Sequence, residues 1–414
     1  MLQVLIVDDS ATVLKIIRHV SGRLTHLKPV FASSFEQAKQ LYLSAPDQYF
    51  AALSDYSLPD SPNGELIDFL LEQGLPTVVL SGSFNEKNQG ELILKGVVDY
   101  VLKEGRYSYE LAMDLLNQLY QNRNVKVLVA EDSRSARKYI VGQLNRHLYQ
   151  VIEAENGAIA LQALRDDPEI KLLITDYQMP EMDGYQLVQT IRHEMATRRL
   201  SILGLSSADN VIVSSKFIKN GADDFLHKPF SVEEFQCRVS HNLNTLSMLE
   251  ELEKAAYQDY LTEIPNRRFF IERARELYEQ AESKQTQLAV AVMDIDKFKL
   301  FNDQHGHEAG DAVLKHFAQI LKRCLGKFVF GRTGGEEFSV AMAGLSNDQA
   351  YQLLDAFRNQ IADSQCDYNG QQLTITVSIG VTNDLSEHLE GQLHHADELL
   401  YNAKEAGRNL VVGD

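Results

Sequence analysis

The sequence has few cysteines and no long apolar run, and these absences exclude several classes of protein. Cys237, Cys324 and Cys366 are odd in number and far apart, so they form neither a metal-binding pattern nor a disulfide framework. Buried thiols in reducing cytoplasm are the ordinary reading of such cysteines. No apolar stretch approaches the roughly 18 residues that a membrane-spanning helix needs. The N-terminus lacks the basic segment of a signal peptide, so we expect a cytoplasmic protein.

Basic residues are also in deficit. The chain has 40 Lys and Arg residues against 58 Asp and Glu residues, a net charge of −18. This balance disfavours non-specific DNA binding through a basic surface, although a local phosphate site remains compatible with it. The 414 residues are enough for two to four domains, and a hydrophobic content of 44% is ordinary for globular proteins.

The first 245 residues contain a repeat. Residues 4–10 are echoed by residues 127–133, and residues 51–55 by residues 172–176. Two further echoes, of 78–81 by 203–206 and of 96–103 by 221–228, lie at similar offsets. We therefore predict two tandem copies of one domain, over residues 1–123 and 124–245.

Each copy alternates short apolar runs with amphipathic segments such as 11–21 and 135–146. This pattern predicts a doubly wound α/β domain with a parallel sheet. In such sheets the functional side chains gather at the carboxyl ends of the strands. The polar residues at the expected strand ends are Asp8, Asp9, Asp55, Ser81 and Lys103 in the first copy, and Glu131, Asp132, Asp176, Ser206 and Lys228 in the second.

These residue types suit phosphoryl chemistry. The paired acids could bind Mg²⁺ through oxygen ligands, and the single Asp of each copy could act as a nucleophile toward a phosphoryl donor. The Ser hydroxyl and the Lys ammonium could then hold the phosphoryl oxygens. The alternative is that acids at strand ends merely cap helices. Two sets in register disfavour that alternative.

Both copies resemble the receiver domains of two-component response regulators, which have a flavodoxin-like (βα)5 fold. The resemblance implies that Asp55 and Asp176 accept phosphate from a histidine kinase or phosphotransfer protein. It implies Mg²⁺ at the paired acids, including Asp9 and Asp132, and switch hydroxyls at Ser81 and Ser206. The remaining pocket residues would be Asp8, Glu131, Lys103 and Lys228, with Tyr100 and Phe225 at the aromatic switch position.

The first copy departs from this family in one loop. The family has proline after its lysine, usually with a cis bond, and the second copy has Pro229. The first copy has Glu104, for which a cis bond would cost about 3 kcal/mol. We therefore expect a rearranged loop after Lys103. An extra residue between Asp55 and Gly64 also makes Asp176 the more regular phosphoacceptor.

Residues 231–257 predict a helix that ends the second copy and continues as a connector over residues 246–257. Its apolar residues recur at spacings of three and four. The early ones are expected to pack on their own domain and the later ones to pair with another chain, weakly because the stretch 247–256 is short. These residues are Phe235, Val239, Leu243, Leu246, Leu249 and Leu252.

Residues 258–414 predict a further domain. Residues 328–332 and 339–343 are expected strands, joined by Gly334-Gly335-Glu336-Glu337-Phe338. The glycines would allow a tight turn with positive φ, and two carboxylates at a hairpin tip suit a Mg²⁺-nucleotide site, although acidic surface turns are also common.

Other segments of this domain carry polar side chains. A buried strand ends in acids at 294 and 296, residues 301–307 are an expected polar turn, and residues 308–325 an expected helix. Residues 374–381 are an expected strand. Residues 399–406 are an expected helix, with Lys404 and Arg408 on one face if it persists.

This set resembles the GGDEF family of diguanylate cyclases in its GGEEF form. The resemblance implies an α+β fold with a cyclase- or palm-like sheet flanked by helices. It implies the joining of two GTP molecules into cyclic di-GMP with release of two pyrophosphates. Asp294, Glu336 and the Ile295 carbonyl would bind Mg²⁺ or Mn²⁺. Glu336 would also be the general base, with Glu337 as the runner-up.

The same resemblance implies a GTP-binding set. Asn302 and Asp311 would read the guanine edge, and His307 would contact the nucleotide. The backbone of Lys297 and Phe298 would cradle the phosphates, and Lys404 and Arg408 would hold the β- and γ-phosphates. Many members carry an inhibitory product site, Arg-x-x-Asp, where this chain has residues 325–328 as Leu-Gly-Lys-Phe. We therefore expect weak or no product inhibition by that route.

The sequence as a whole predicts a response regulator with a phosphorylation-regulated diguanylate cyclase. Each catalytic domain would hold one GTP, so activity would need a homodimer. The alternative is a catalytically silent scaffold that binds GTP or cyclic di-GMP. The presence of Asp294, Asn302, Asp311 and Glu336 argues against it. A DNA-binding regulator would need a basic recognition helix, which the C-terminal domain lacks.

Overall fold

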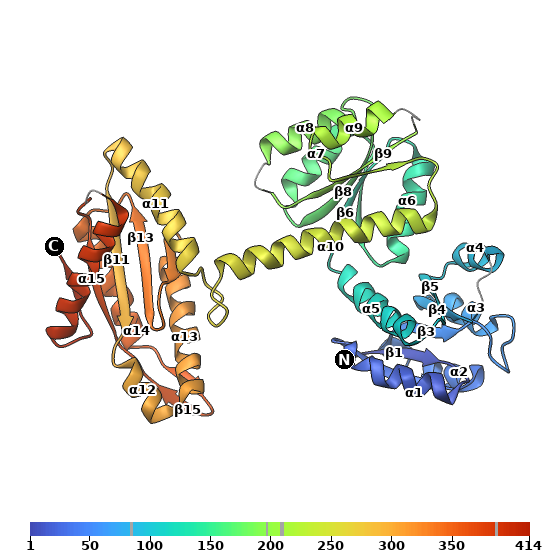
Figure 1. The fold of residues 1–414 in the computed structure, drawn as a ribbon, viewed down its shortest axis with the longest axis horizontal. Helices are drawn as coiled ribbons and strands as arrows, with labels where there is room; N and C mark the ends of the chain where they lie inside the picture. The colour runs from blue at the N-terminus through green and yellow to red at the C-terminus, as the bar shows by residue number, and fades with distance from the viewer. Residues whose placement is uncertain (83–85, 196–197, 208–210, 386–387) are drawn as a thin grey trace. The chain divides into compact units, whose positions relative to one another are not determined.

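The computed structural model describes residues 1–82, 86–195, 198–207, 211–385 and 388–414. The chain divides into two compact units, residues 1–247 and 248–414, and each is described by itself (Figure 1). Within the described residues, no helix has both the length and the apolar composition needed to cross a membrane.

The first sheet has five parallel strands in the order β2-β1-β3-β4-β5. Helices connect the strands, as a parallel sheet requires. The strands are β1 Leu2–Val7, β2 Leu27–Ala32, β3 Tyr49–Asp55, β4 Thr77–Ser81 and β5 Asp99–Leu102. The helices are α1 Ala11–Val20, α2 Phe35–Ser44, α3 Glu65–Glu72, α4 Glu86–Lys95 and α5 Arg106–Asn122, with short 3₁₀ turns η1 Ser21–Arg23 and η2 Pro46–Gln48.

The second sheet repeats this topology. Its parallel strands run in the order β10-β9-β8-β6-β7, the same arrangement written from the other edge. The strands are β6 Lys126–Ala130, β7 Gln150–Ala154, β8 Ile170–Asp176, β9 Ser201–Ser206 and β10 Asp224–His227. The helices are α6 Arg134–Arg146, α7 Gly157–Asp166, α8 Gly184–Glu194 and α9 Val211–Lys219.

The strand sequences explain these two sheets. β3 is buried at every residue, and β8 at all but one, because helices cover both faces. Ser10 and Ser133, which follow the paired acids, accept from Val13 N–H and Ala136 N–H and so begin α1 and α6. The predicted doubly wound α/β fold is confirmed in both copies.

Helix α10, Val232–Tyr257, agrees with the predicted connector helix to within one residue. Phe235 and Val239 are fully buried in the second α/β core, as expected for its early apolar residues. Leu249 and Leu252, in the later part, are 47% and 66% exposed. The helix therefore has an apolar surface beyond the domain that its first turns cover.

The second unit is built on a mixed sheet in the order β12-β13-β11-β16-β17. All neighbours are antiparallel except β16 and β17. Its strands are β11 Leu288–Ile295, β12 Val329–Arg332, β13 Glu337–Ala343, β16 Val377–Thr382 and β17 Val411–Gly413, beside a separate hairpin of β14 Cys366–Tyr368 and β15 Gln371–Leu373. Its helices are α11 Arg267–Lys284, α12 Phe298–His305, α13 His307–Leu325, α14 Asn347–Ala362 and α15 Leu389–Glu405.

Residues of β11 alternate between two helical layers. Ala289, Ala291 and Met293 lie in the core that includes residues of α13 and α14. Val292 packs instead with Ala396 and Leu400 of α15. Since side chains alternate along a strand, Asp294 is expected on the α15 side of the sheet.

Three boundaries of this unit differ from the sequence predictions. The expected polar turn 301–307 is wrong, because residues 298–305 form α12; Phe298, Phe301 and His305 stack at helical spacing. The strand expected over 374–381 begins at Val377 and is buried throughout. The helix expected from Leu399 begins ten residues earlier, at Leu389.

Candidate functional site

The first α/β domain brings its predicted polar residues together at the strand ends. Lys103 Nζ lies 2.7 Å from Asp8 Oδ2 and 2.6 Å from Asp55 Oδ2. Carboxylate oxygens of Asp8, Asp9 and Asp55 lie within 4.8 Å of one another. Asp8 is fully buried, whereas Asp9 is exposed and faces solvent.

The second domain repeats this pocket. Lys228 Nζ lies 2.6 Å from Glu131 Oε2 and 2.5 Å from Asp176 Oδ1. Oxygens of Glu131, Asp132 and Asp176 again lie within 4.8 Å of one another. In both domains the lysine backbone N–H donates to the carbonyl of the predicted switch serine, Ser81 or Ser206, at 2.8 Å.

Burial shifts the pKa values of some groups in these pockets. It raises the pKa of the Asp55 carboxyl, against the opposing influence of Lys103. Burial alone would lower the pKa of Lys103, but its hydrogen bonds to Asp55 and Asp8 outweigh that effect and raise it. The same causes raise the pKa values of Glu131 and Lys228. Each pocket thus combines carboxylate oxygen donors with one protonated lysine. Its exposed acid, Asp9 or Asp132, makes the pocket accessible from solvent, and such a set of oxygen donors fits Mg²⁺.

The two pockets differ directly after the lysine. Lys228–Pro229 is a cis peptide bond, and within the described residues it is the only one, so Lys103–Glu104 is trans. In the first domain Glu104 N–H donates to Leu102 O at 2.9 Å, and Gly105 follows with φ of 140°. The loop therefore takes a different path after Lys103, as its missing proline predicts.

In the second unit the GGEEF segment lies at the β12–β13 hairpin, but its glycines act differently from the prediction. Neither Gly334 nor Gly335 has a positive φ. A Cβ on Gly334 would lie 2.4 Å from Glu337 Oε2, so a larger residue there would require the Glu337 side chain to shift. Glu337 and Phe338 belong to β13, which leaves Glu336 as the acid of the turn itself.

Asp294 is the buried acid beside this hairpin. It pairs across the strands with Glu337, and the backbone N–H of Ile295 donates to Glu336 O at 3.3 Å. Lys404 Nζ of α15 lies 3.0 Å from Asp294 Oδ2. Burial raises the pKa of Asp294; Lys404 opposes this, and the charges of Glu336 and Glu337 add to it. The negative charges of the three carboxylates thus repel one another, and a divalent cation bound to their oxygens would offset this repulsion.

The predicted phosphate-cradling residues lie directly after β11. Lys297 has a left-handed φ of 55° and caps α12, whose first residue is Phe298. The free N–H groups of a helix N-terminus suit phosphate. Ile295, whose main-chain carbonyl is a predicted metal ligand, is buried at the end of β11.

Asn302 stands out among the predicted guanine-reading residues. Its Oδ1 is buried and lacks a hydrogen-bond partner within the described residues. A Cβ on Gly310 of α13 would lie only 1.9 Å from that oxygen, so α12 and α13 approach closely at this point. His307 and Asp311, on the first turns of α13, are exposed.

Arg408 does not share a helix face with Lys404. Helix α15 ends at Glu405, and Arg408 follows Gly407 in a turn with a left-handed φ of 64°. Within the described part of the chain its guanidinium has no ion-pair partner, and the residue is exposed. The shared helix face was predicted only if the helix persisted, and that condition is not met, because Gly407 redirects the backbone after α15.

One connection at the hairpin escaped the sequence analysis. Arg332 Nη1 donates to Asp259 Oδ1 at 2.8 Å, while its Nε and Nη2 donate to the Gly335 carbonyl at 3.0 and 2.6 Å. Both side chains of this ion pair are largely buried. An arginine two residues before a Gly-Gly turn was the available signal, but its partner lies 73 residues away.

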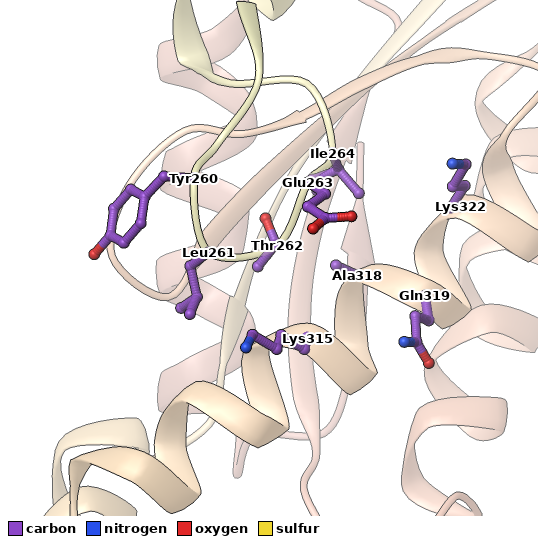
Figure 2. Close-up of a pocket in the computed structure, with 9 residues that line it drawn as sticks. All are labelled: Tyr260, Leu261, Thr262, Glu263, Ile264, Lys315, Ala318, Gln319 and Lys322. Atoms are coloured by element: carbon purple, nitrogen blue, oxygen red, sulfur yellow. The ribbon is translucent and has the colours of Figure 1, made fainter. Parts of the chain in front are cut away.

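A separate pocket of about 380 Å³ lies between the 260–264 loop and α13 (Figure 2). In the close-up, Lys315, Gln319 and Lys322 extend from α13, and the Glu263 carboxylate lies across from them. None of its lining residues belongs to the predicted catalytic set.

The fold and these sites define a modular protein with two acid-pocket α/β domains and a mixed-sheet domain with an acidic hairpin. Comparison with known proteins agrees. Residues 127–240 match the family described as "Response regulator receiver domain", and residues 256–410 match "Diguanylate cyclase, GGDEF domain". A crystal structure described as that of a two-component system response regulator/GGDEF domain protein is 40% identical, covers 60% of this chain and 100% of its own, with a TM-score of 0.55.

The chain belongs to the response regulators that combine receiver and GGDEF domains. It is similar to the response regulator PleD of Caulobacter vibrioides, at 28% identity over 300 residues, which cover 70% of this chain and 65% of PleD. It is also similar to the diguanylate cyclase DgcP of Pseudomonas aeruginosa, at 40% identity over 167 residues, which cover 40% of this chain and 25% of DgcP. The match thus spans less than two thirds of the length of either relative.

Proposed function

We propose that this protein is a diguanylate cyclase whose activity is regulated by phosphorylation of its receivers. The observation that carries the proposal lies at the adjoining ends of β11 and β13. There the charges of Glu336 and Glu337 act on the buried Asp294, and Lys404 forms an ion pair with Asp294. Nucleotidyl transfer needs this combination of negative donors for a metal and a cation for phosphate. A cytoplasmic location is part of the proposal.

The proposed reaction joins two GTP molecules by two equivalent steps. In each, the 3′-hydroxyl oxygen of one GTP forms a bond to the α-phosphorus of the other, the bond from that phosphorus to the bridging oxygen breaks, and pyrophosphate leaves. Glu336 would accept the hydroxyl proton. Bound at Asp294, Glu336 and the Ile295 carbonyl, Mg²⁺ or Mn²⁺ would neutralise phosphate charge and acidify the hydroxyl.

The other residues would bind and orient GTP. The N–H groups after Lys297 would receive the phosphates, and Lys404 and Arg408 would hold their outer oxygens. Asn302 Oδ1, which is buried and has no hydrogen-bond partner among the described residues, could accept from the guanine edge, with Asp311 and His307 nearby in sequence. When metal binds, Lys404 would move from Asp294 to the phosphates, since the metal would then neutralise Asp294 and the lysine would neutralise the phosphates.

Each domain would hold one GTP, so the product would form between two copies of the chain. Phosphoryl transfer to Asp176 or Asp55 from a cognate histidine kinase or phosphotransfer protein would shift the population toward the productive homodimer. The exposed apolar surface of α10 is a candidate contact between the copies.

Incubation of the full chain with GTP and Mg²⁺, followed by chromatography of the products, tests the activity. We expect cyclic di-GMP and pyrophosphate from the parent, and a fall in kcat of about 100-fold or more in Glu336→Gln. Glu337→Gln, the matched control, should lose less. Tight GTP binding with no product from the parent would contradict the proposal and leave the silent-scaffold alternative.

A further inference from the structure

A second acid follows the catalytic strand, and its contacts differ from those of Asp294. Asp296 accepts from Ser378 Oγ at 2.6 Å and from Thr376 Oγ1 at 2.7 Å, both in or just before the neighbouring strand β16. Its Oδ2 also accepts from the backbone N–H of Asn409 at 3.0 Å. Asp296 thus connects the end of β11 to a segment 113 residues later.

The segment that it holds has an unfavourable backbone conformation. Gly407, Arg408 and Asn409 have successive φ values of 119°, 64° and 47°. Glycine adopts such values without strain and asparagine tolerates them, but arginine seldom does, so Arg408 in particular requires outside support. Arg408 N–H donates to Ala403 O at 3.1 Å, and Asn409 Oδ1 accepts from Arg358 at 2.9 Å. The third support is the charge-assisted hydrogen bond that Asn409 N–H donates to Asp296 Oδ2.

The two acids of this strand end therefore hold the C-terminal segment at two points. Asp294 holds the Lys404 side chain, and Asp296 holds the backbone directly after Arg408. Arg408 lies between these points, and its guanidinium has no ion-pair partner in the described residues. The direction of the Arg408 side chain is therefore determined mainly by the conformation of its backbone.

We propose that Asp296 is a positioning residue for GTP, which fixes the left-handed turn at 407–409 and so directs Arg408 toward the phosphates. The inference rests on the proposed function in that it takes GTP as the ligand. It assigns Asp296 no contact with nucleotide or metal. Its carboxylate already accepts three hydrogen bonds, which commit both oxygens to protein donors.

A double-mutant cycle tests this role in the full chain. The variants are Asp296→Ala, Arg408→Ala and the two combined, and the readout is calorimetric affinity for a GTP analogue with a non-hydrolysable α–β bond. Asp296→Ala should weaken binding about tenfold, as loss of a charge-assisted support implies. Because Asp296 acts through Arg408, the combined variant should bind no more weakly than Arg408→Ala alone.

Conservative variants separate positioning from other roles. Asp296→Asn retains one acceptor oxygen and should bind closer to the parent than Asp296→Ala. Thr376→Val should weaken binding in the same direction but less, and it serves if Asp296→Ala does not fold. Asp367→Asn, an exposed acid on the β14–β15 hairpin, is the matched control and should bind as the parent does.

Three results would overturn the inference. They are parent-like affinity in Asp296→Ala, additive losses in the combined variant, or a loss seen only when Mg²⁺ is present, which would make Asp296 a metal ligand. The proposed function fails separately, if the parent binds the analogue but makes no cyclic di-GMP from GTP. If the parent makes cyclic di-GMP and Asp296→Ala binds the analogue as the parent does, the proposed function stands and only the positioning role of Asp296 is contradicted.

Discussion

Asp99 and Asp224 occupy the same position in the two receivers but have different surroundings. Each accepts a hydrogen bond from the following backbone N–H, at 2.8 Å and 2.7 Å. Asp224 also accepts from Arg238 and Asn242. Asp99 has no such cation in the described residues, and burial raises its pKa to about 6. The charged form of Asp99 is therefore a destabilising feature of the first receiver.

The substitution Asp99→Asn is predicted to stabilise the folded chain near neutral pH by about 1–3 kcal/mol. An acid whose pKa is raised in the folded state binds more protons there than in the unfolded state. Stability should therefore fall as pH rises from about 4 to about 6 in the parent, and this part of the slope should vanish in Asp99→Asn. Urea unfolding at pH 4 and pH 7.5 measures both effects. Equal stability of the two proteins at pH 7.5 would count against this account.

At the scale of elements, continuous apolar runs were the most reliable guide to this chain. The parallel sheets followed from runs such as 172–174, and the pocket acids followed from where those runs stop. Residues 301–305 were missed because Asn302 and Asp303 are typical turn residues, while the aromatic stacking that favours a helix depends on packing. Connections such as Asp259 with Arg332 could not be predicted, because nothing local pairs residues so far apart.

The connection from Asp259 through Arg332 to the Gly335 carbonyl orders the hairpin that carries Glu336. Arg332→Lys retains the charge but loses the planar fork that reaches both partners. We predict a fall in kcat of about tenfold with a smaller change in KM for GTP. Steady-state kinetics measure this, and Arg323→Lys, at an exposed position of α13, is the control. A KM effect alone would indicate that the connection serves binding instead.

The exposed end of α10 is predicted to contribute to pairing of two chains. Leu252→Glu places a charge on a side chain that is 66% exposed in the single chain, and it should weaken self-association about tenfold. Analytical ultracentrifugation measures the association, and Glu251→Gln is the neighbouring control. Activity should fall at low protein concentration and recover at high concentration. Unchanged association in Leu252→Glu would exclude this surface.

At the scale of the whole molecule, two domains with acidic pockets precede a GGDEF domain. In the proposed function the receivers accept phosphate and each GGDEF domain holds one GTP. Two GGDEF domains would then have to meet for a product to form, so the regulated quantity would be the population of dimers. Phosphorylation would then act most strongly where the unmodified chains are mostly single.

The most direct test is the rate of cyclic di-GMP formation per chain against protein concentration, with and without a small-molecule phosphodonor, for the parent and for Asp55→Asn/Asp176→Asn. The account predicts that the parent's rate per chain rises with concentration, and that the phosphodonor moves this rise to lower concentration. The double variant should show the same rise without that shift. A rate per chain independent of concentration, or a phosphodonor shift that persists in the double variant, would contradict it.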